Sequence, residues 1–225
     1  MLKERLDMIL SYIDGKIVAD IGTDHGYIPV RLATDKKVEK VIATDLNKGP
    51  LDAARENVLK NNAEDIVKLR LGSGLLPIAA GECDNIVIAG MGGELISRIL
   101  RDSEDVAKST NKLLLQPMNS QDTLRKYLLE NGYEIIKEDI KVEGFKVYNL
   151  IIARKGSGEM PKDPIFLHLP ESLKDHREFP SLLKKKKREF EKILTGLKKA
   201  TDKDNNQIEK YEYLLKRTLE IEESV

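Results

Sequence analysis

The chain has 225 residues, of which 40% are hydrophobic and 34% charged, and its 38 basic residues balance its 38 acidic ones. This composition suits one medium-sized domain with an appendage and excludes an intrinsically disordered chain. A net charge of zero gives no global attraction to nucleic acid, although a local basic patch remains compatible with it.

The location of the protein is predicted from what its sequence lacks. Cys83 is the single cysteine, so no internal disulfide can form, and the stretch after Met1 has no long apolar run. No segment approaches the ~20 apolar residues that span a membrane. We therefore expect a cytoplasmic protein without a signal peptide, partnered with neither membrane nor metal. His168 and His176 lie in a polar segment without a cysteine partner, and we expect both to be solvated.

Hydrophobic spacing predicts alternating strands and helices over the first two thirds of the chain. In chain order the expected elements are a helix over 2–13, a strand over 17–21, a helix over 28–36, a strand over 41–44, a helix over 50–61, strands over 67–71 and 85–89, a helix over 94–100, a strand over 113–115, a helix over 120–131, and strands over 133–142 and 145–153. The last two strands flank Glu143 and Gly144, which predict a hairpin turn. The alternation predicts an α/β fold with a seven-stranded, mostly parallel, doubly wound sheet that carries one antiparallel strand.

The chain changes character after residue 155. Residues 155–180 contain four prolines and predict a linker. Beyond it, Leu183, Phe190, Ile193, Leu194 and Leu197 share one helical face, and so do Ile208, Tyr211, Leu215 and Leu219. Residues 180–200 hold eight Lys/Arg and two Asp/Glu, a net of +6, whereas residues 201–225 hold four and seven, a net of −3. We expect a domain over 1–155, followed over 156–225 by a linker and a coiled-coil-like antiparallel helical hairpin whose helices pair in charge and apolar stripe.

The turn after the first strand is the most informative segment. Gly22 and Gly26 make a glycine turn that Asp20 and Asp24 flank, and about twenty residues later the second strand ends in Asp45. A glycine turn and a following acid are how an open α/β sheet binds a ribose-containing cofactor. Asp24 stands near the place where a dinucleotide fingerprint has its second glycine, and its charge would repel a diphosphate. The turn therefore favours S-adenosylmethionine, a cationic cofactor without phosphate, over NAD.

Three segments together resemble the bacterial tRNA (adenine(22)-N1)-methyltransferases. They are Asp-Ile-Gly-Thr-Asp-His-Gly-Tyr-Ile-Pro over 20–29, Ile-Ala-Gly-Met-Gly-Gly over 88–93 and Leu-Gln-Pro over 115–117. The resemblance covers roughly residues 1–155. It implies a Rossmann-like class I methyltransferase domain with a C-terminal helical hairpin, which transfers a methyl group from S-adenosylmethionine to N1 of adenine 22 in tRNA. The chain departs from the family pattern in the segment 168–180 and in Met118 after Gln-Pro.

The resemblance assigns cofactor contacts to the glycine turns and strand ends. Asp20 or Asp24 is expected to accept from the ammonium group, Asp45 from the ribose hydroxyls, and Leu46 to lie against the adenine. The complete expected set of cofactor-binding residues is Asp20, Gly22, Asp24, Gly26, Asp45, Leu46, Gly72, Ser73, Gly74, Gly90 and Met91.

The acceptor nitrogen already carries a lone pair, so methyl transfer needs alignment and water exclusion more than a base. Asp24, His25 and Tyr27 are the candidate catalytic residues near the target adenine. Asp24 cannot easily serve both the ammonium group and the adenine. The basic run Lys184, Lys185, Lys186, Lys187 and Arg188 is expected to contact tRNA phosphates, with a solvated helix face as the alternative.

Other functions remain open at the level of sequence. The same fold also serves methyltransferases with a different small-molecule or protein acceptor. A non-catalytic RNA-binding module that keeps an emptied cofactor fold is a second alternative, which the retained Asp45 disfavours. An NAD enzyme is a third, which the missing middle glycine disfavours.

Overall fold

The computed structural model describes residues 4–202 and 204–224. The chain forms two compact units. The first contains the chain up to Asp139 together with Tyr148–Met160, and the second contains Ile140–Val147 together with the chain from Pro161 onward. The sequence predicts a boundary at residue 155; in the structure, the tip of a hairpin also belongs to the second unit.

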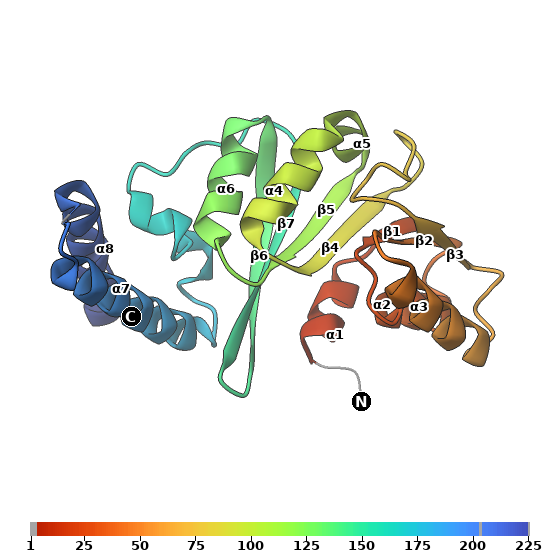
Figure 1. Ribbon diagram of the computed structural model, residues 1–225, viewed down its shortest axis with the longest axis horizontal. Coiled ribbons are helices and arrows are strands. Elements are labelled where there is room, and N and C mark those ends of the chain that lie inside the picture. Colours follow the sequence, from red (N-terminus) through yellow and green to blue (C-terminus); the bar gives the residue numbers. More distant parts are fainter. Residues whose placement is uncertain (1–3, 203, 225) are drawn as a thin grey trace. The chain divides into compact units, whose positions relative to one another are not determined.

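The first unit is built on a sheet of seven strands, the number that the sequence predicts, in the order β3-β2-β1-β4-β5-β7-β6 (Figure 1). The strands are β1 Ile17–Ile21, β2 Lys40–Asp45, β3 Val67–Leu71, β4 Asn85–Met91, β5 Lys112–Pro117, β6 Tyr133–Glu143 and β7 Lys146–Lys155. β1 to β5 pair with one another in parallel, and β7 runs antiparallel to β5. The chain order reverses between β1 and β4, which places the switch point of the fold at these two strands.

Helices cover both faces of this sheet. α1 Glu4–Ser11, α2 Tyr27–Thr34 and α3 Lys48–Lys60 lie on one face, and α4 Gly93–Asp102, α5 Glu104–Ser109 and α6 Gln121–Glu130 lie on the other (Figure 1). α5 is absent from the sequence-based expectation because a six-residue helix contains too few turns to show a period. Leu2, which the sequence assigns to the first helix, lies outside the described residues.

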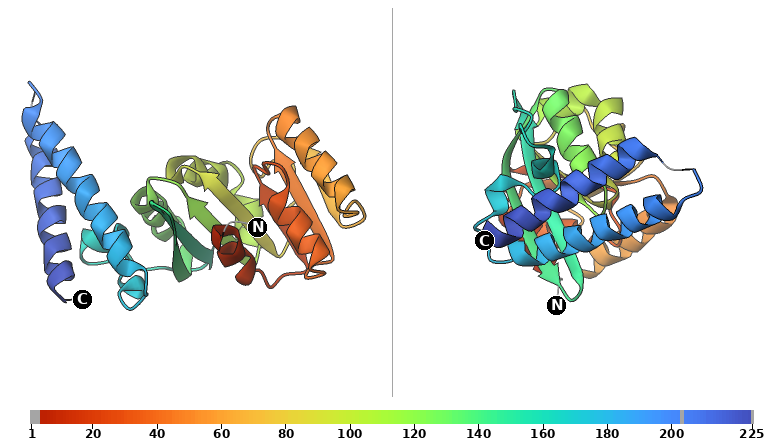
Figure 2. Two further views of the ribbon diagram at one scale, coloured as in Figure 1. Left: turned by 90° about the horizontal axis from the view of Figure 1, so that it is seen from below. Right: turned by 90° about the vertical axis from the view of Figure 1, so that its left-hand side faces the viewer.

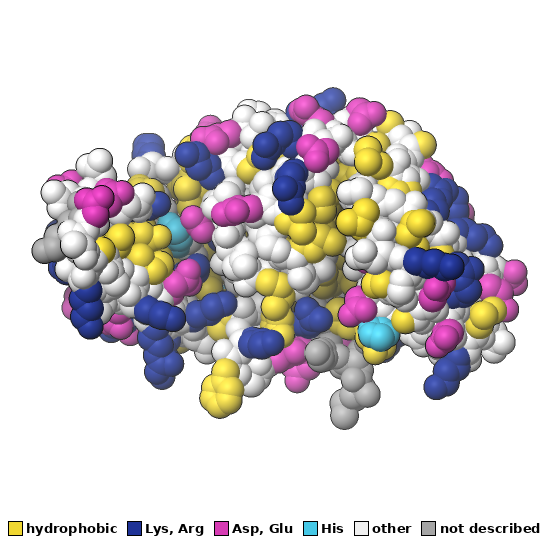
Figure 3. Space-filling view, viewed as in Figure 1, with side chains coloured by type: hydrophobic (Ala, Val, Ile, Leu, Met, Phe, Trp, Pro, Cys, Tyr) yellow, Lys and Arg dark blue, Asp and Glu magenta, His cyan; other side chains and the backbone are white. Residues whose placement is uncertain are grey.

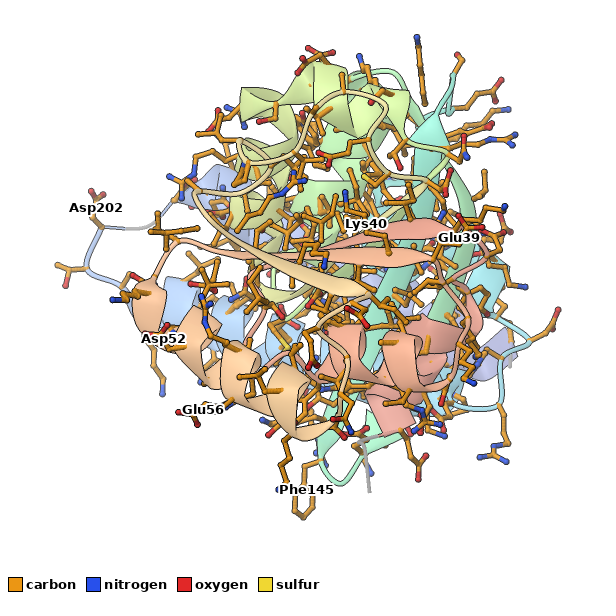
Figure 4. The ribbon with its side chains drawn as sticks, turned by 90° about the vertical axis from the view of Figure 1, so that its right-hand side faces the viewer. Glu39, Lys40, Asp52, Glu56, Phe145 and Asp202 are labelled. Atoms are coloured by element: carbon orange, nitrogen blue, oxygen red, sulfur yellow. The ribbon has the colours of Figure 1, made fainter. Side chains whose placement is uncertain are left out.

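The strands divide their side chains between two cores because successive residues point to opposite faces. Val18 and Val41 join the core beneath α1 to α3, whereas Ala19 and Ile42 join the core beneath α4 to α6. Both faces are therefore apolar, which is why the parallel strands are nearly continuous hydrophobic runs. The outer side of α3 is polar instead: Asp52 and Glu56, one turn apart, point away from the sheet (Figure 4).

The second unit has its own core, and the segment expected to be a linker contributes to it. Two short 3-10 helices, η1 Pro164–Leu167 and η2 Glu171–Leu173, bury Ile165 and Leu173. The expectation that His168 is solvated is wrong: it is buried and packs edge-to-face on Phe190 at 5.2 Å between ring centroids. Prolines predict the irregular backbone of this segment correctly, but they carry no information about burial.

Two long helices, α7 Phe179–Lys199 and α8 Asn205–Ser224, form the expected antiparallel hairpin, visible from two sides in Figure 2. Phe190, Leu214 and Ile221 are buried in their core. The predicted charge pairing is confirmed by ion pairs of Lys187 with Glu222 at 2.6 Å and of Lys198 with Glu212 at 2.5 Å. Within the described residues, no helix combines the length and apolarity that crossing a membrane requires.

Candidate active site

The turn after β1 is shaped by its backbone. The N–H groups of Gly22 and Thr23 both donate to the carbonyl of Thr44 at 2.8 Å, which ties the turn to the end of β2. Gly22 has φ of +74°, and a Cβ atom built on it would lie 2.1 Å from Cε of Met91. A residue with a side chain would be strained at this φ and would displace the end of the Met91 side chain, so the turn favours glycine.

The next residues project the three candidate catalytic side chains. His25 adopts φ of +59°, and the side-chain amide of Asn57 donates to its carbonyl at 2.9 Å, which holds this strained residue in place. Nε2 of His25 lies 3.4 Å from Oδ1 of Asp24, and the rings of His25 and Tyr27 are 5.6 Å apart. All three side chains are exposed, so they are available to a ligand.

A crevice of about 390 Å³ opens at the carboxyl ends of β1 and β4. It brings together six of the predicted site residues: Asp20, Gly22, Asp24, Tyr27, Gly90 and Met91. The other lining residues are Arg5, Leu6, Ile28, Ala89 and Met118. The position is the one expected for a ligand in a doubly wound sheet.

Asp20 is the buried carboxylate of this crevice. Burial raises its pKa from 3.8 to about 6, and the charge of Asp45 acts in the same direction. A buried carboxylate of this kind is stabilised by a cation, because a nearby positive charge offsets the loss of water. The crevice is thus prepared for a positively charged ligand.

Five further predicted residues lie along the neighbouring strand ends and do not line the crevice. Asp45 ends β2, where its carboxylate accepts from the N–H of Asn47 at 2.7 Å, and Leu46 next to it is 64% exposed. Gly72, Ser73 and Gly74 follow β3, and the N–H of Gly72 donates to the carbonyl of Asp45 at 2.9 Å. Gly26 is the N-cap residue of α2, His25 precedes Gly26, and neither residue lines the crevice. We call Asp45, Leu46, Gly72, Ser73 and Gly74, which lie beside the crevice at the ends of β2 and β3, the shelf.

Sequence reasoning missed a cation in the crevice. Arg5, on α1, donates to Oε1 of Gln116 at 3.2 Å and lies over the ring of Tyr148 at 5.1 Å from its centroid. Gln116 is fully buried at the end of β5. Arg5 falls on the polar side of an amphipathic helix, where sequence alone predicts only a solvated charge. The Gln-Pro pair that ends β5 is the sequence signal closest to Arg5.

A family profile described as a methyltransferase domain matches residues 2–151. The tRNA (adenine(22)-N(1))-methyltransferase of Bacillus subtilis is 36% identical over 167 residues, which are 74% of this chain and 70% of the relative. This chain belongs to the tRNA (adenine(22)-N1)-methyltransferase family.

Solved structures of the family agree over the whole chain. The crystal structure of the B. subtilis m1A22 tRNA methyltransferase TrmK matches with a TM-score of 0.85 at 27% identity and covers 98% of each chain. A Streptococcus pneumoniae protein described as a candidate tRNA (m1A22) methyltransferase, solved in complex with S-adenosyl-L-methionine, matches with a TM-score of 0.86 at 27% identity, over 98% of this chain and 99% of the other. The family resemblance and the fold expected from the sequence are therefore confirmed.

The five residues of the predicted RNA-binding run differ widely in exposure. Lys186 is only 3% exposed and pairs with Glu189 at 3.1 Å. Lys185 donates to the carbonyl of Val147, and burial lowers its pKa. Lys187 is engaged by Glu222. Lys184 and Arg188 are exposed, one turn apart on α7.

Proposed function

We propose that this chain transfers the methyl group of S-adenosylmethionine to N1 of adenine 22 in tRNA, with the roles of its residues as follows. The observation that carries the proposal is the acidic, diphosphate-averse crevice at the switch point of a chain of this family. Since tRNA is the substrate, we infer that the protein acts in the cytoplasm.

The residues of the crevice fit the donor. When bound, S-adenosylmethionine supplies an electrophilic methyl group on a sulfonium cation. Asp20, a buried carboxylate, accepts from the ammonium group, and Gly22 leaves room for the methionine part to approach the backbone. Arg5, the cation among the lining residues, binds the carboxylate of that part. Asp45 and Leu46, on the neighbouring shelf, hold the ribose hydroxyls and the adenine.

The acceptor side of the crevice is assigned to the exposed residues of the turn. Because Asp20 serves the ammonium group, Asp24 remains for the target base, where it accepts from the exocyclic amino group. This contact makes N1 more electron-rich and stabilises the cationic product. Tyr27, 50% exposed and beside His25, stacks on the base. N1 lies on the Watson–Crick edge, so the adenine reaches this site only when it is unpaired or flipped out.

The second unit supplies the electrostatic contact with tRNA. Lys184, Arg188 and Lys192 recur at every fourth position of α7, all three are exposed, and they make no ion pair with other residues of the described chain. We call them the basic stripe. Of the predicted run, Lys184 and Arg188 belong to this stripe, while the engaged Lys185, Lys186 and Lys187 support the helix hairpin.

Nucleoside analysis of tRNA tests the proposal. The purified protein is incubated with S-adenosylmethionine and unmodified tRNA, and the digested nucleosides are separated by mass. We expect 1-methyladenosine, and none from a matched tRNA in which guanine replaces adenine 22.

Two other outcomes would contradict the proposal in different ways. Binding of S-adenosylmethionine by calorimetry without any methylated nucleoside would indicate another acceptor. Absence of both binding and product would indicate a non-catalytic RNA-binding module.

A further inference from the structure

A second hollow lies at the same edge of the sheet, and the roles assigned above leave it unused. It has a volume of about 620 Å³ and is formed by residues along the length of α4 and by the loop between β5 and α6. We call it the arginine cleft. Its lining includes Gly92, Glu94, Leu95, Arg98, Arg101 and Asn119.

A narrow backbone ridge separates this cleft from the crevice. Met91 and Met118 line the crevice, whereas the residues that directly follow them, Gly92 and Asn119, line the cleft. The N–H of Met118 donates to the carbonyl of Met91 at 2.8 Å, and the N–H of Gly93 donates to the carbonyl of Asn119 at 3.0 Å. The two hollows are therefore adjacent, with these bonded loops as their common wall.

The ridge is tightly packed. A Cβ atom built on Gly93 would lie 2.1 Å from the carbonyl oxygen of Ser120, and one built on Gly92 would lie 2.8 Å from the side-chain oxygen of Asn119. Two consecutive glycines thus allow the loops after β4 and β5 to touch. A ligand group that lies over this ridge meets a fixed surface.

The charge of the cleft is opposite to that of the crevice. Arg98 is exposed and makes no hydrogen bond or ion pair with another residue in the described ranges, and Arg101 lies over the ring of Tyr127 at 5.7 Å from its centroid. Glu94 is the acidic member of the lining, so the two guanidinium groups leave a net positive charge. Lys and Arg side chains are visible over α4 in the space-filling view (Figure 3). Guanidinium groups in such a hollow suit phosphate, which they bind through paired N–H donors.

We propose that the arginine cleft binds a backbone phosphate of the RNA strand next to the adenine that enters the crevice. The inference rests on the proposed function. The flipped base occupies the acidic crevice, but the phosphodiester attached to its nucleotide stays outside, at the rim. Asp20 and Asp24 repel that phosphate from the crevice, whereas Arg98 and Arg101, just beyond the ridge, attract it. The cleft thus positions the strand so that N1 faces the donor.

Kinetics of three variants of the full chain test the inference. Arg98→Gln/Arg101→Gln is expected to raise KM for tRNA about tenfold, because charged hydrogen bonds to phosphate are lost. The slope of log affinity for tRNA against log salt concentration should fall by about 1 to 2. The affinity for S-adenosylmethionine should not change, because the donor lies in the crevice. Arg98→Lys/Arg101→Lys keeps the charge and should restore the slope but only part of the affinity, because an ammonium group lacks the paired N–H donors of guanidinium. Arg55→Gln, which removes one exposed charge on α3, serves as a control and should keep the wild-type values.

The outcomes separate this inference from the proposed function. If the wild-type protein methylates adenine 22 and the Gln variant keeps its KM and salt slope, the inference is overturned while the function stands. If the Lys variant has the same reduced salt slope as the Gln variant although both bind S-adenosylmethionine normally, the arginines act through structure and the inference is also wrong. If the wild-type protein methylates no tRNA, both fall together.

Discussion

The crevice and the arginine cleft occupy the same edge of one sheet but differ in charge. The acidic residues of the crevice are Asp20, near the end of β1, and Asp24, in the following turn. The basic residues of the cleft are Arg98 and Arg101, on α4, which follows the neighbouring strand β4. The strand backbone is equivalent at both places. The comparison teaches that a parallel sheet supplies hollows at its carboxyl edge, and that a few residues in the connections decide whether each one holds a cation or an anion.

Replacement of Asp20 is expected to have the largest effect on this contrast. Asp20→Asn keeps the shape of the crevice but removes the charge that faces the donor's ammonium group. We expect S-adenosylmethionine to bind about 100-fold more weakly, or about 2.7 kcal/mol, as measured by calorimetry. KM for tRNA, which depends on the cleft, should remain within about twofold when the donor is saturating. An unchanged donor affinity would contradict the assignment of Asp20.

The pH dependence tests the role of Asp20 further, because donor affinity falls and the stability of the ligand-free protein rises as the pH is lowered. The pKa of Asp20 is raised to about 6, and its carboxylate form binds the cation, so donor affinity should fall by up to about tenfold per pH unit below pH 6. Without ligand, the folded state holds this proton more tightly than the unfolded state. The contribution of Asp20 to stability is therefore fully present below about pH 4 and is lost as the pH rises through 6. Asp20→Asn should weaken both pH dependences: that of donor affinity, measured by calorimetric titration, and that of stability, measured by thermal melting.

Replacement of Gly93 tests the common wall. The added methyl group of Gly93→Ala would lie against the carbonyl of Ser120, and overpacking of this kind costs about 1–3 kcal/mol of stability. Because the ridge borders both hollows, donor affinity and KM for tRNA should both worsen. Gly49→Ala, whose added atom meets open space on α3, is the control and should keep both values. Loss of only one of the two properties would show that the ridge does not couple the hollows.

The smallest effect is expected far along the chain, in the basic stripe. Lys184→Gln/Arg188→Gln should weaken tRNA binding by a few-fold and lower the salt slope by about 1, because exposed charges contribute modestly. Lys210→Gln/Lys216→Gln, exposed on α8, removes the same charge as a control. Equal losses in the two variants would indicate a nonspecific contribution of net charge instead of the stripe.

The sequence predicts the fold of the first unit well because its period is strong. Every strand of the sheet and the hairpin at β6 and β7 follow from apolar runs such as Val41–Ala43 and from the turn residues and acids that end several of them. The second unit shows the limit of such reasoning. Proline and polar residues suggest a loose linker over 155–180, but Ile165 and Leu173 are buried there. Isolated apolar residues in irregular backbone have no period that sequence analysis can detect.

The candidate site divides in the same way. Asp20, Asp24 and Gly22 are predictable because their chemistry is written into one turn. Arg5 and Arg98 are not, since each lies on the polar face of a helix, where most charges are solvated. Arg5 reaches the crevice because α1 approaches the end of β5. Arg98 lines the arginine cleft because the loops after β4 and β5 approach each other. Lys186 is the reverse case: a residue within a basic run that the tertiary structure buries.

The β6–β7 hairpin has a practical consequence for dissection of the protein. Its strands begin in the sheet, but Ile140 and Val147 pack in the core of the second unit with Phe179 and Leu182, and Phe145 at its tip is fully exposed (Figure 4). A truncated chain that ends near residue 160 would retain the hairpin but lose the residues that bury Ile140 and Val147. The exposed apolar side chains would then favour aggregation. An isolated catalytic half should therefore be made by also replacing Ile140–Val147 with a short tight turn, and not by cutting the chain alone.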